Sequence, residues 1–560
     1  MSYMNFIKRN FGVFYSPNEE VNEVLNPESI GKASGLSDVD SGETTQNGSD
    51  AMETEAPTVS EGAAVIKPRT RREHFIAKLA GNPNAKDLDP KARWEFFMAK
   101  IAGNQKAMFV QPKTREEILM NEFAAEPVGA PVVYGFRVDS SVEGSSSDCV
   151  TYLESAVGME PAAMDFANGT WSYGGWENAF FMPKPCMLKY DGTVDYYLDP
   201  NDYSKKADGS ASDAANAAYG GNAMMEWGQN GQKIWYKIVP DTDDPTSANV
   251  YIANYQADKN YHAWSFINNQ GTMVDHFYTP IYNGTLDGDG RLRSISGVTY
   301  ANYCKSKTAA EEIAAAELNN PGSDKLWYTE TFADITLIQL LTVLITKSLN
   351  PKETIGEGSY DLGREESFML ATGSMDDKGM FWGGDHTVGV KCFGMENFWG
   401  NQMRRFAGLV FDGGYKYKLT AGTEDGSLAS GYNTTGEGYL DSGYGSDGFD
   451  GLIDKQSFNG SAMFMTGAYE GEDESYLGAY GSYGAAGGAL GGGVSYALRG
   501  GTVGAHAGNC GLFSLRLLAD AAVADWALGA APSCKPLSGE GHGETLLPVD
   551  PSDPISKDSK

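Results

Sequence analysis

The residues that could bind a metal or act as nucleophiles are few and widely separated in this chain of 560 residues. The six cysteines form no Cys-x-x-Cys pair, and the six histidines show no helical metal-binding spacing. His262 and His276 each stand near an aromatic residue, which is typical of structural histidines rather than ligands. Ser-His-Asp and P-loop patterns are also absent. We therefore expect no catalytic site, no resident cofactor, and cysteines that are reduced, buried thiols.

Two acidic, glycine-rich loops are candidate calcium sites. They are Leu286–Gly290 (LDGDG) and Asp441–Asp454 (DSGYGSDGFDGLID). Ca²⁺ prefers the carboxylate and carbonyl oxygens that such loops offer. Neither loop fits the EF-hand pattern, and Asp-Gly pairs also form tight turns without a metal. Calcium therefore stays open as a ligand, with ordinary turns as the alternative.

The segment Gly431–Tyr483 is rich in tyrosine and glycine. Tyrosine offers a large contact area at a low entropic cost, and glycine and serine give adaptable loops, so this composition is typical of a binding surface. Tyrosine rings also stack on sugars. We expect Tyr432, Tyr439 and Tyr444 to contact a ligand. Packing of the same segment against neighbouring subunits is the alternative.

The composition excludes several classes of partner. The formal charge of −31 opposes binding to nucleic acid, whose phosphates require clustered lysine and arginine, and it opposes binding to anionic membranes. The longest apolar run, Ile335–Ile345, is shorter than the ~20 residues that span a bilayer, so it predicts a buried helix and no membrane insertion. Met1–Asn10 lacks the apolar run of a signal peptide. Gly makes up 69 of the 560 residues, which favours turns and short strands over helix bundles.

The beginning of the chain has the composition of a tether. Residues 11–66 contain eleven acidic residues and one basic residue, Lys32, which predicts disorder. Met1–Phe14 places aromatic residues around a basic pair, which predicts a docking peptide at the tip of the tether. An unstructured tail without a partner is the alternative.

A repeat follows the tether over residues 67–126. Three copies of a 22-residue pattern open at Pro68, Pro90 and Pro112, and each copy has one apolar helical face. Helices this short are marginal alone, so they should pack on each other or on a partner. We expect a small three-helix unit, with three separate docking helices as the alternative.

Short runs rich in aromatic and β-branched residues follow Pro127 and predict strands. The dipeptide Asp191-Gly192 has the composition of a tight hairpin turn. The segment Cys149–Val157 fits a short helix or a strand. The expected strands are Val132–Val138, Phe180–Met182, Met187–Tyr190, Val194–Leu198, Lys233–Val239, Val250–Tyr255 and Gly511–Leu517. The expected helices are Thr308–Leu318 and Phe332–Leu349, the second one ended by Asn350 and Pro351.

An Arg-Gly-Gly step near the C-terminus precedes a loop and a strand. Arg499 carries five donors in a rigid fork and can tie loop carbonyls together. Gly500 and Gly501 permit backbone angles and close approaches that a Cβ forbids. The residues that complete the pattern are Phe513, Trp526 and Gly529. This order resembles the closing motif of the C-type-lectin-like fold shared by formylglycine-generating enzymes and phage tropism determinants.

Longer segments between residues 180 and 533 resemble structural proteins of phages that infect gut bacteria. These segments are Met182–Tyr203, Gly220–Trp235, His262–Asn268, Arg291–Gly297 and Glu396–Val410. Enzymes of the lectin-like family often carry a Gly-Asn-Val-Trp-Glu-Trp run, where this chain has Gly-Asn-Gln-Met-Arg-Arg. Trp399 precedes that run, and we expect it to plug the core.

The resemblance implies an α+β fold class. A β-rich domain is expected over residues 127–255 and a C-type-lectin-like domain over residues 256–534, with a Gly/Tyr-rich insertion at 431–483. The tether and the helical repeat precede them, and a flexible tail at 535–560 follows.

The resemblance also implies a binding surface and a function. By likeness to the positions that vary in tropism determinants, the ligand-binding residues are His506, Asn509, Ser514, Arg516, Asp520 and Asp525. We expect a non-enzymatic virion protein, made in the host cytoplasm: a trimeric tail-fibre adhesin that binds a host-surface receptor or glycan. Residues 1–126 would bind other virion proteins. The alternatives are a head or collar decoration protein with a lectin-like structural module, and a degenerate oxygenase-like enzyme.

Overall fold

The computed structural model describes residues 131–139, 142, 147–414, 416–445, 450–468, 480–483, 494–504, 510–517 and 519–537. All of them belong to the second of the two units into which the chain divides, Pro127–Lys560. The expected docking peptide, tether and helical repeat lie outside the described residues. The flexible tail expected at 535–560 is wrong at its start, because Lys535 is buried, and its residues beyond 537 lie outside the described residues.

Strands dominate the described residues, of which 33% lie in strands and 11% in helices. The α-helices among them are α5 (Ala309–Glu317), α6 (Phe332–Thr346) and α7 (Pro351–Thr354). Short 3-10 turns lie at Gln229–Gly231, Trp264–Phe266, Tyr300–Asn302 and Glu366–Phe368. The expected α+β class is therefore wrong for this part of the chain, which is β-rich. Outside α5 and α6, glycine, asparagine and aspartate interrupt the sequence so often that helices cannot extend.

One seven-stranded sheet gathers strands from both ends of the described region. Its order is β14–β26–β11–β8–β5–β6–β7. The strands are β5 (Lys184–Lys189), β6 (Val194–Asp199), β7 (Asp202–Lys206), β8 (Gly221–Trp227), β11 (Phe277–Pro280), β14 (Trp327–Thr329) and β26 (Pro532–Cys534). Because β8 and β11 pair across the domain boundary expected at residue 255, the two regions on either side of it share a sheet.

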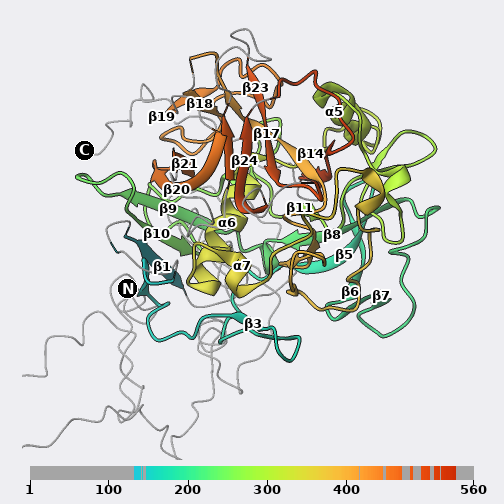
Figure 1. The fold of residues 1–560 in the computed structure, drawn as a ribbon, viewed down its shortest axis with the longest axis horizontal. Helices are drawn as coiled ribbons and strands as arrows, with labels where there is room; N and C mark the ends of the chain where they lie inside the picture. Colours follow the sequence, from blue (N-terminus) through green and yellow to red (C-terminus); the bar gives the residue numbers. More distant parts are fainter. Residues whose placement is uncertain are drawn as a thin grey trace, which may run out of the picture. The chain divides into compact units, whose positions relative to one another are not determined.

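A nine-stranded sheet holds the Arg-Gly-Gly step. Its order is β19–β18–β17–β23–β24–β22–β20–β21, and β25 pairs with β17 beside this path. The strands are β17 (Met403–Phe411), β18 (Lys416–Leu419), β19 (Leu440–Gly445), β20 (Asp450–Phe458), β21 (Met463–Ala468), β22 (Tyr480–Tyr483), β23 (Ser495–Gly500), β24 (Gly511–Leu517) and β25 (Leu528–Gly529). Every residue of β23 is buried between β17 and β24, so the step begins inside the sheet (Figure 1).

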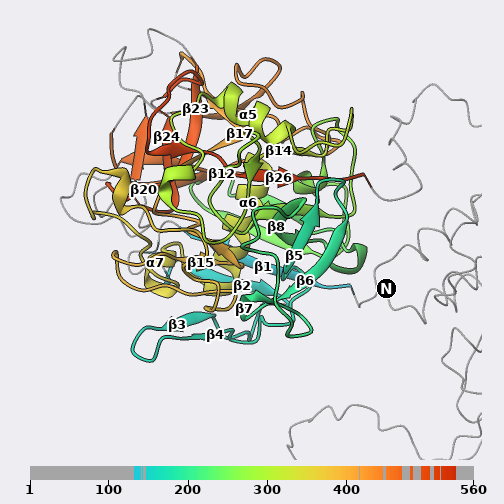
Figure 2. The same cartoon turned by 90° about the vertical axis from the view of Figure 1, so that its right-hand side faces the viewer.

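Smaller sheets complete the fold. A four-stranded sheet has the order β2–β1–β10–β9. Its strands are β1 (Val133–Val138), β2 (Val150–Glu154), β9 (Trp235–Pro240) and β10 (Ala248–Ala253). Two-stranded ribbons join β3 (Ala163–Asp165) to β4 (Thr170–Ser172), β12 (Thr285–Leu286) to β13 (Leu292–Arg293), and β15 (Lys391–Cys392) to β16 (Met395–Glu396). The two views show α6 enclosed among these sheets (Figures 1 and 2).

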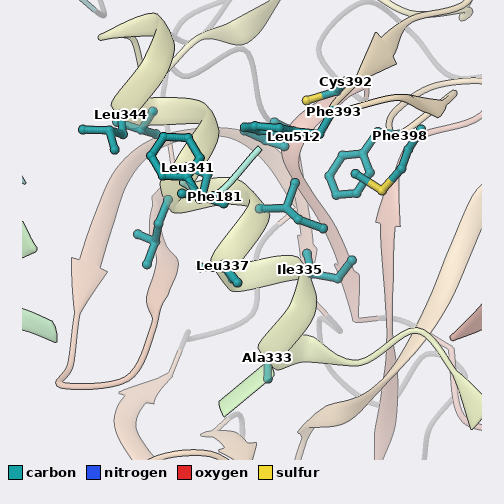
Figure 3. Close-up of a cluster of buried hydrophobic side chains, with 14 of the residues drawn as sticks. Phe181, Ala333, Ile335, Leu337, Leu341, Leu344, Cys392, Phe393, Phe398 and Leu512 are labelled. Carbon is teal, nitrogen blue, oxygen red and sulfur yellow. The ribbon is translucent and has the colours of Figure 1, made fainter. Parts of the chain in front are cut away.

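Helix α6 lies at the centre of the core. Every residue of α6 except Gln339 is buried, and a helix that is apolar on all sides must be enclosed by protein. Thr331 caps its N-terminus by accepting a hydrogen bond from the Asp334 N–H. Figure 3 shows the side chains packed around it, which come from loops and strands far apart in sequence: Phe181, Cys392, Phe393, Phe398 and Leu512.

Most expected elements are present close to their predicted ranges. Strands β1, β6 and β24 and helix α5 match within a few residues, and the Asp191-Gly192 turn is present with its glycine at φ 80°. Within the segment Cys149–Val157, Val150–Glu154 forms strand β2 and the flanking residues form turns. The expected strand Phe180–Met182 is wrong, because Phe180 and Phe181 lie in a turn, and Phe181 packs beside α6 (Figure 3). Helix α6 stops earlier than expected because Lys347 adopts a left-handed φ of 51°.

Candidate functional site

Two arginines lie opposite each other inside the nine-stranded sheet. Arg499 of β23 faces Arg404 of β17 in the strand register, and their side chains are 3% and 1% exposed. Burial lowers the pKa of Arg404 to about 9, helped by the charge of Arg499, and burial also lowers the pKa of Arg499. Arginine side chains stay protonated in proteins, so both guanidinium groups carry a positive charge at neutral pH.

Glu330 bridges the two arginines. Arg499 donates a hydrogen bond to Glu330 Oε1 at 2.5 Å, and Arg404 Nη1 lies 3.5 Å from Oε2. Arg499 also donates to the Phe398 carbonyl and lies over the Phe398 ring, 4.0 Å from its centroid. Glu330 precedes α6, whereas Phe398 follows the β15–β16 ribbon. Arg499 thus ties together three segments that are far apart in sequence.

Two further buried ion pairs connect helices to strands. Lys535 Nζ, just after β26, lies 2.8 Å from Asp334 Oδ1 in α6. Arg405 Nη1 of β17 lies 2.6 Å from Glu312 Oε1 in α5. Burial raises the pKa of Glu312 to about 7 and also raises that of Asp334, because desolvation outweighs the attraction of the paired cation. The charged groups here fasten α5 and α6 to the sheets.

The remaining motif residues occupy interior or half-buried positions. Gly500 and Gly501 have φ angles of 89° and 82°. A Cβ at Gly500 would lie 3.2 Å from Trp399 Cα, so the strand can pass this close only without a side chain. Trp399 is fully buried and donates its indole N–H to a backbone carbonyl at 3.1 Å, as expected of a core plug. Phe513 is buried, and Trp526 is half-buried.

Two of the three tyrosines expected to contact a ligand are buried in the packing of the protein. Tyr432 and Tyr439 are only 8% and 9% exposed. Tyr432 stacks on Tyr328 with ring centroids 5.7 Å apart, and the Tyr439 hydroxyl donates to the Asn433 carbonyl at 3.1 Å. The half-buried Tyr444 donates to a backbone carbonyl at 2.6 Å. Because Tyr432 and Tyr439 are buried, their rings are not accessible for stacking on a sugar.

The residues expected around the terminal loop have different environments. Ser514 is buried. Asp520 and Asp525 each use a carboxylate oxygen to accept nearby backbone N–H groups, so they form turns. Arg516 is exposed on β24 and remains the best placed of the set to meet an external ligand. The other two candidates, His506 and Asn509, lie outside the described residues.

A buried charged cluster that the sequence did not indicate lies at the β15–β16 ribbon. Lys391 and Glu396 are cross-strand partners and both are fully buried. Glu396 accepts the backbone N–H groups of Gly373 and Met375, each at 2.8 Å, and Lys391 donates to the Met375 carbonyl at 2.9 Å. Lys391 Nζ also lies 3.6 Å from the centroid of the Tyr203 ring. The pair therefore clamps a loop onto the ribbon.

Burial perturbs the titration of this cluster. Desolvation lowers the pKa of Lys391 to about 8 and raises that of Glu396 to about 7. Nearby Asp376 accepts hydrogen bonds from Tyr282 Oη at 2.5 Å and Ser296 Oγ at 2.6 Å, and burial raises its pKa as well. Perturbed carboxyl and amino groups often mark active sites. Here their bonds go to the backbone and side chains of the protein itself, which indicates a structural role.

Carboxylates of the two candidate calcium loops bond within the protein. Asp287 accepts N–H bonds from Asp289 at 3.0 Å and Arg291 at 2.9 Å, and it lies 3.3 Å from Arg293 Nη1. Asp441 pairs with a lysine at 2.9 Å, and residues 446–449 of that loop lie outside the described residues. Across the described ranges, no three His, Cys, Asp or Glu side chains form a group suited to a metal ion.

The cysteines and the two singled-out histidines lie in packed surroundings. All six cysteines are described, all are buried, and no disulfide joins them, which confirms the expected buried thiols. His262 packs against Trp264 with ring centroids 4.6 Å apart. His276 is partly exposed, and its Nδ1 lies 3.9 Å from Glu226. These positions favour structural imidazoles, as the sequence indicated.

A shallow hollow lies between α5 and the β12–β13 ribbon. Its volume is about 280 Å³, and its lining is mostly apolar: Leu286, Gly290, Lys307, Glu311, Ala314, Ala315 and Leu318. Glu311 already completes the capping box of α5 with Thr308. The hollow has room for a small molecule, but it offers few polar groups to orient one.

Neither the described helices nor comparisons with known proteins assign the chain to a protein class. Most of the 15 residues of α6 are apolar, yet among the described helices none is both long and apolar enough to cross a bilayer. No protein-family model matches the chain, and no curated protein matches it at a significant level.

Proposed function

We propose that this chain is a non-enzymatic phage virion protein whose β-rich region, akin to a C-type lectin domain, binds a receptor or glycan on the host surface. The place of the Arg-Gly-Gly step carries the proposal. Arg499 joins β23 to Glu330 and Phe398, and Gly500 lets the strand pass close to Trp399. These contacts join separate loops and strands at the Arg-Gly-Gly step, the motif on which the resemblance to lectin-like domains rests.

The pairing of β26 supports a module that is closed at one side. β26 pairs with both β11 and β14, so the beginning and the end of the lectin-like region meet in the seven-stranded sheet. β24 belongs to the other large sheet (Figure 1). The strand pairing of β26 therefore lies in one sheet, and the strand that bears Arg516 lies in the other. We expect such a separation in a domain that displays a binding surface.

A head or collar decoration protein is the second candidate. The burial of Tyr432 and Tyr439 favours it, because two of the expected ligand contacts are packed inside the molecule. In that role the lectin-like region would be a structural module without a host ligand. Attachment to other virion proteins through residues 1–126 and a homotrimeric assembly belong to both proposals.

Host binding by the full-length protein separates the two proposals. The adhesin proposal predicts saturable binding to host cells or to their purified surface glycans, measured by flow cytometry or surface plasmon resonance. Arg516→Ala is expected to weaken that binding by about tenfold or more, because arginine anchors often dominate binding patches. The melting temperature should not change, since Arg516 is exposed.

Lys189→Ala is the matched control for this experiment. Lys189 is a cation on the seven-stranded sheet, its side chain is 46% exposed, and it pairs with Asp195 at 2.8 Å. Its loss should leave host binding unchanged. A wild-type protein that binds no host surface, yet adds saturably to particles lacking it, would replace the adhesin proposal with the decoration proposal.

A further inference from the structure

The Arg404–Arg499–Glu330 cluster carries one more positive charge than it has negative charges. All three side chains are buried, whereas the other two buried ion pairs at the helices each join one cation to one carboxyl group. The neighbouring Cys392 thiol is uncharged, because burial raises its pKa to about 12. Burial likewise raises the pKa of Tyr303 beside Arg404, so its hydroxyl is neutral. A buried net charge is costly unless a counter-ion joins it.

The cluster also contains donors without acceptors. Within the described part of the chain, Arg499 Nε and Arg404 Nη1 are buried and have no hydrogen-bond partner. Glu330 does not satisfy them, because its Oε1 accepts from Arg499 Nη2 and its Oε2 is 3.5 Å from Arg404. A charged donor that is buried without a hydrogen bond loses its hydration without full compensation.

A small cavity lies beside Arg499, between α6 and the nine-stranded sheet. Its volume is about 20 Å³, and Arg499, Gln339 and Ser514 are its polar lining. The rest of the lining is apolar and includes Phe332 and Phe513. One water molecule needs a cavity of roughly 10–15 Å³ on this measure, so the space suits a single particle of about that size.

We propose that this cavity binds one monovalent anion of the size of chloride, with Arg499 as its main ligand. An anion satisfies Arg499 Nε and cancels the extra positive charge, whereas a water molecule satisfies the donor and leaves the charge. The volume excludes phosphate, sulfate and carboxylate-bearing molecules. Gln339, whose side-chain amide donates one N–H to the Leu512 carbonyl, can add its second N–H to the shell of the ion.

Thermal unfolding of the full chain tests the proposal. Chloride is titrated against gluconate at constant ionic strength, so that general screening does not change. We expect the melting temperature to rise and then saturate, because a ligand that binds only the folded state stabilises it in proportion to its occupancy. Bromide should substitute for chloride. A melting temperature that does not change with the chloride concentration under these conditions overturns the proposal.

Charge variants of the cluster make opposite predictions. Arg404→Gln removes the extra charge and should raise the half-saturating chloride concentration at least about tenfold. Glu330→Gln leaves two positive charges and should lower that concentration by a similar factor. Lys418→Gln removes a half-buried cation that pairs with Asp441, away from the cluster, and should change nothing. A change in the same direction for both cluster variants contradicts the proposal.

Crystals of the wild-type protein grown in bromide provide a test that needs no variant. An anomalous peak within hydrogen-bond reach of Arg499 Nε is the expected result. Density at that position without anomalous signal identifies a water molecule and overturns the anion site.

Discussion

Arg499 is the residue at which distant parts of the chain meet. Its guanidinium donates to Glu330 ahead of α6 and to the Phe398 carbonyl after the β15–β16 ribbon. Without it, the nearest cation to Glu330 among the described residues is Arg404, at 3.5 Å and without a hydrogen bond. The stability of the nine-stranded sheet should therefore depend on this one side chain.

Arg499→Ala is expected to lower the free energy of unfolding by about 3–5 kcal/mol, because it leaves a buried carboxylate without its hydrogen-bonded partner. Arg499→Lys should recover little, since an ammonium group lacks the fork that reaches Glu330 and Phe398 together. Urea unfolding measures both changes. Arg516→Ala removes an exposed arginine from the neighbouring strand and should stay within about 0.5 kcal/mol of the wild type. An equally stable Arg499→Ala protein would show that the motif match is accidental.

At the scale of elements, α6 depends on being enclosed. Its residues have no polar face, so its stability comes from packing against the sheets and loops around it rather than from solvent contact. Leu341 is fully buried within that packing (Figure 3).

Leu341→Ala is expected to destabilise the protein by about 2–5 kcal/mol, because it removes buried area and leaves a cavity that the surroundings only partly fill. Leu318→Ala makes the same chemical change next to α5, where the side chain is 53% exposed, and should cost less than about 0.5 kcal/mol. Thermal unfolding compares the two variants. Equal losses would contradict the central role of α6.

At the scale of the whole molecule, buried and exposed carboxyl groups respond to pH in opposite ways. Burial raises the pKa of Glu312 and of Glu396 to about 7, above the unfolded value of 4.5. Their contribution to stability is fully present below the unfolded pKa and is lost as pH rises through about 7. Side-chain hydrogen bonds lower the pKa of exposed carboxylates such as Asp208 and Asp385, so their contribution is lost as pH falls through the folded pKa.

The free energy of unfolding is therefore expected to rise as pH falls from about 7 to about 5, and to fall in stronger acid. His262, whose pKa burial lowers, opposes the first trend but is a single group. Glu396→Gln should flatten the rise, and urea unfolding across this pH range measures it. Glu311→Gln is the control, because the pKa of Glu311 is lowered by backbone hydrogen bonding and its effect belongs to stronger acid.

Local signals predicted elements better than they predicted sites. Strand β6 was predictable because a turn and alternating residues lie next to each other in its sequence. Helix α5 was predictable because a Thr-x-x-Glu cap opens an alanine-rich segment. The environment of Tyr432 was not, because the ring that covers it belongs to Tyr328, in a different part of the sequence. The Lys391–Glu396 cluster was hidden for a similar reason. Lys391 and Glu396 become neighbours only in the β15–β16 hairpin, in whose turn Phe393 has a left-handed φ of 47°.

The position of β26 has a consequence for the timing of synthesis. β26 lies between β11 and β14 in the seven-stranded sheet, although about 250 residues separate β11 from β26 along the chain. At the usual translation rates this interval is roughly 10–50 s, during which the facing edges of β11 and β14 await their shared neighbour on the ribosome. Unpaired edges of this kind are templates for aggregation. The nascent chain therefore passes through a vulnerable period, and rapid translation or a chaperone that covers these edges should increase the yield of folded protein.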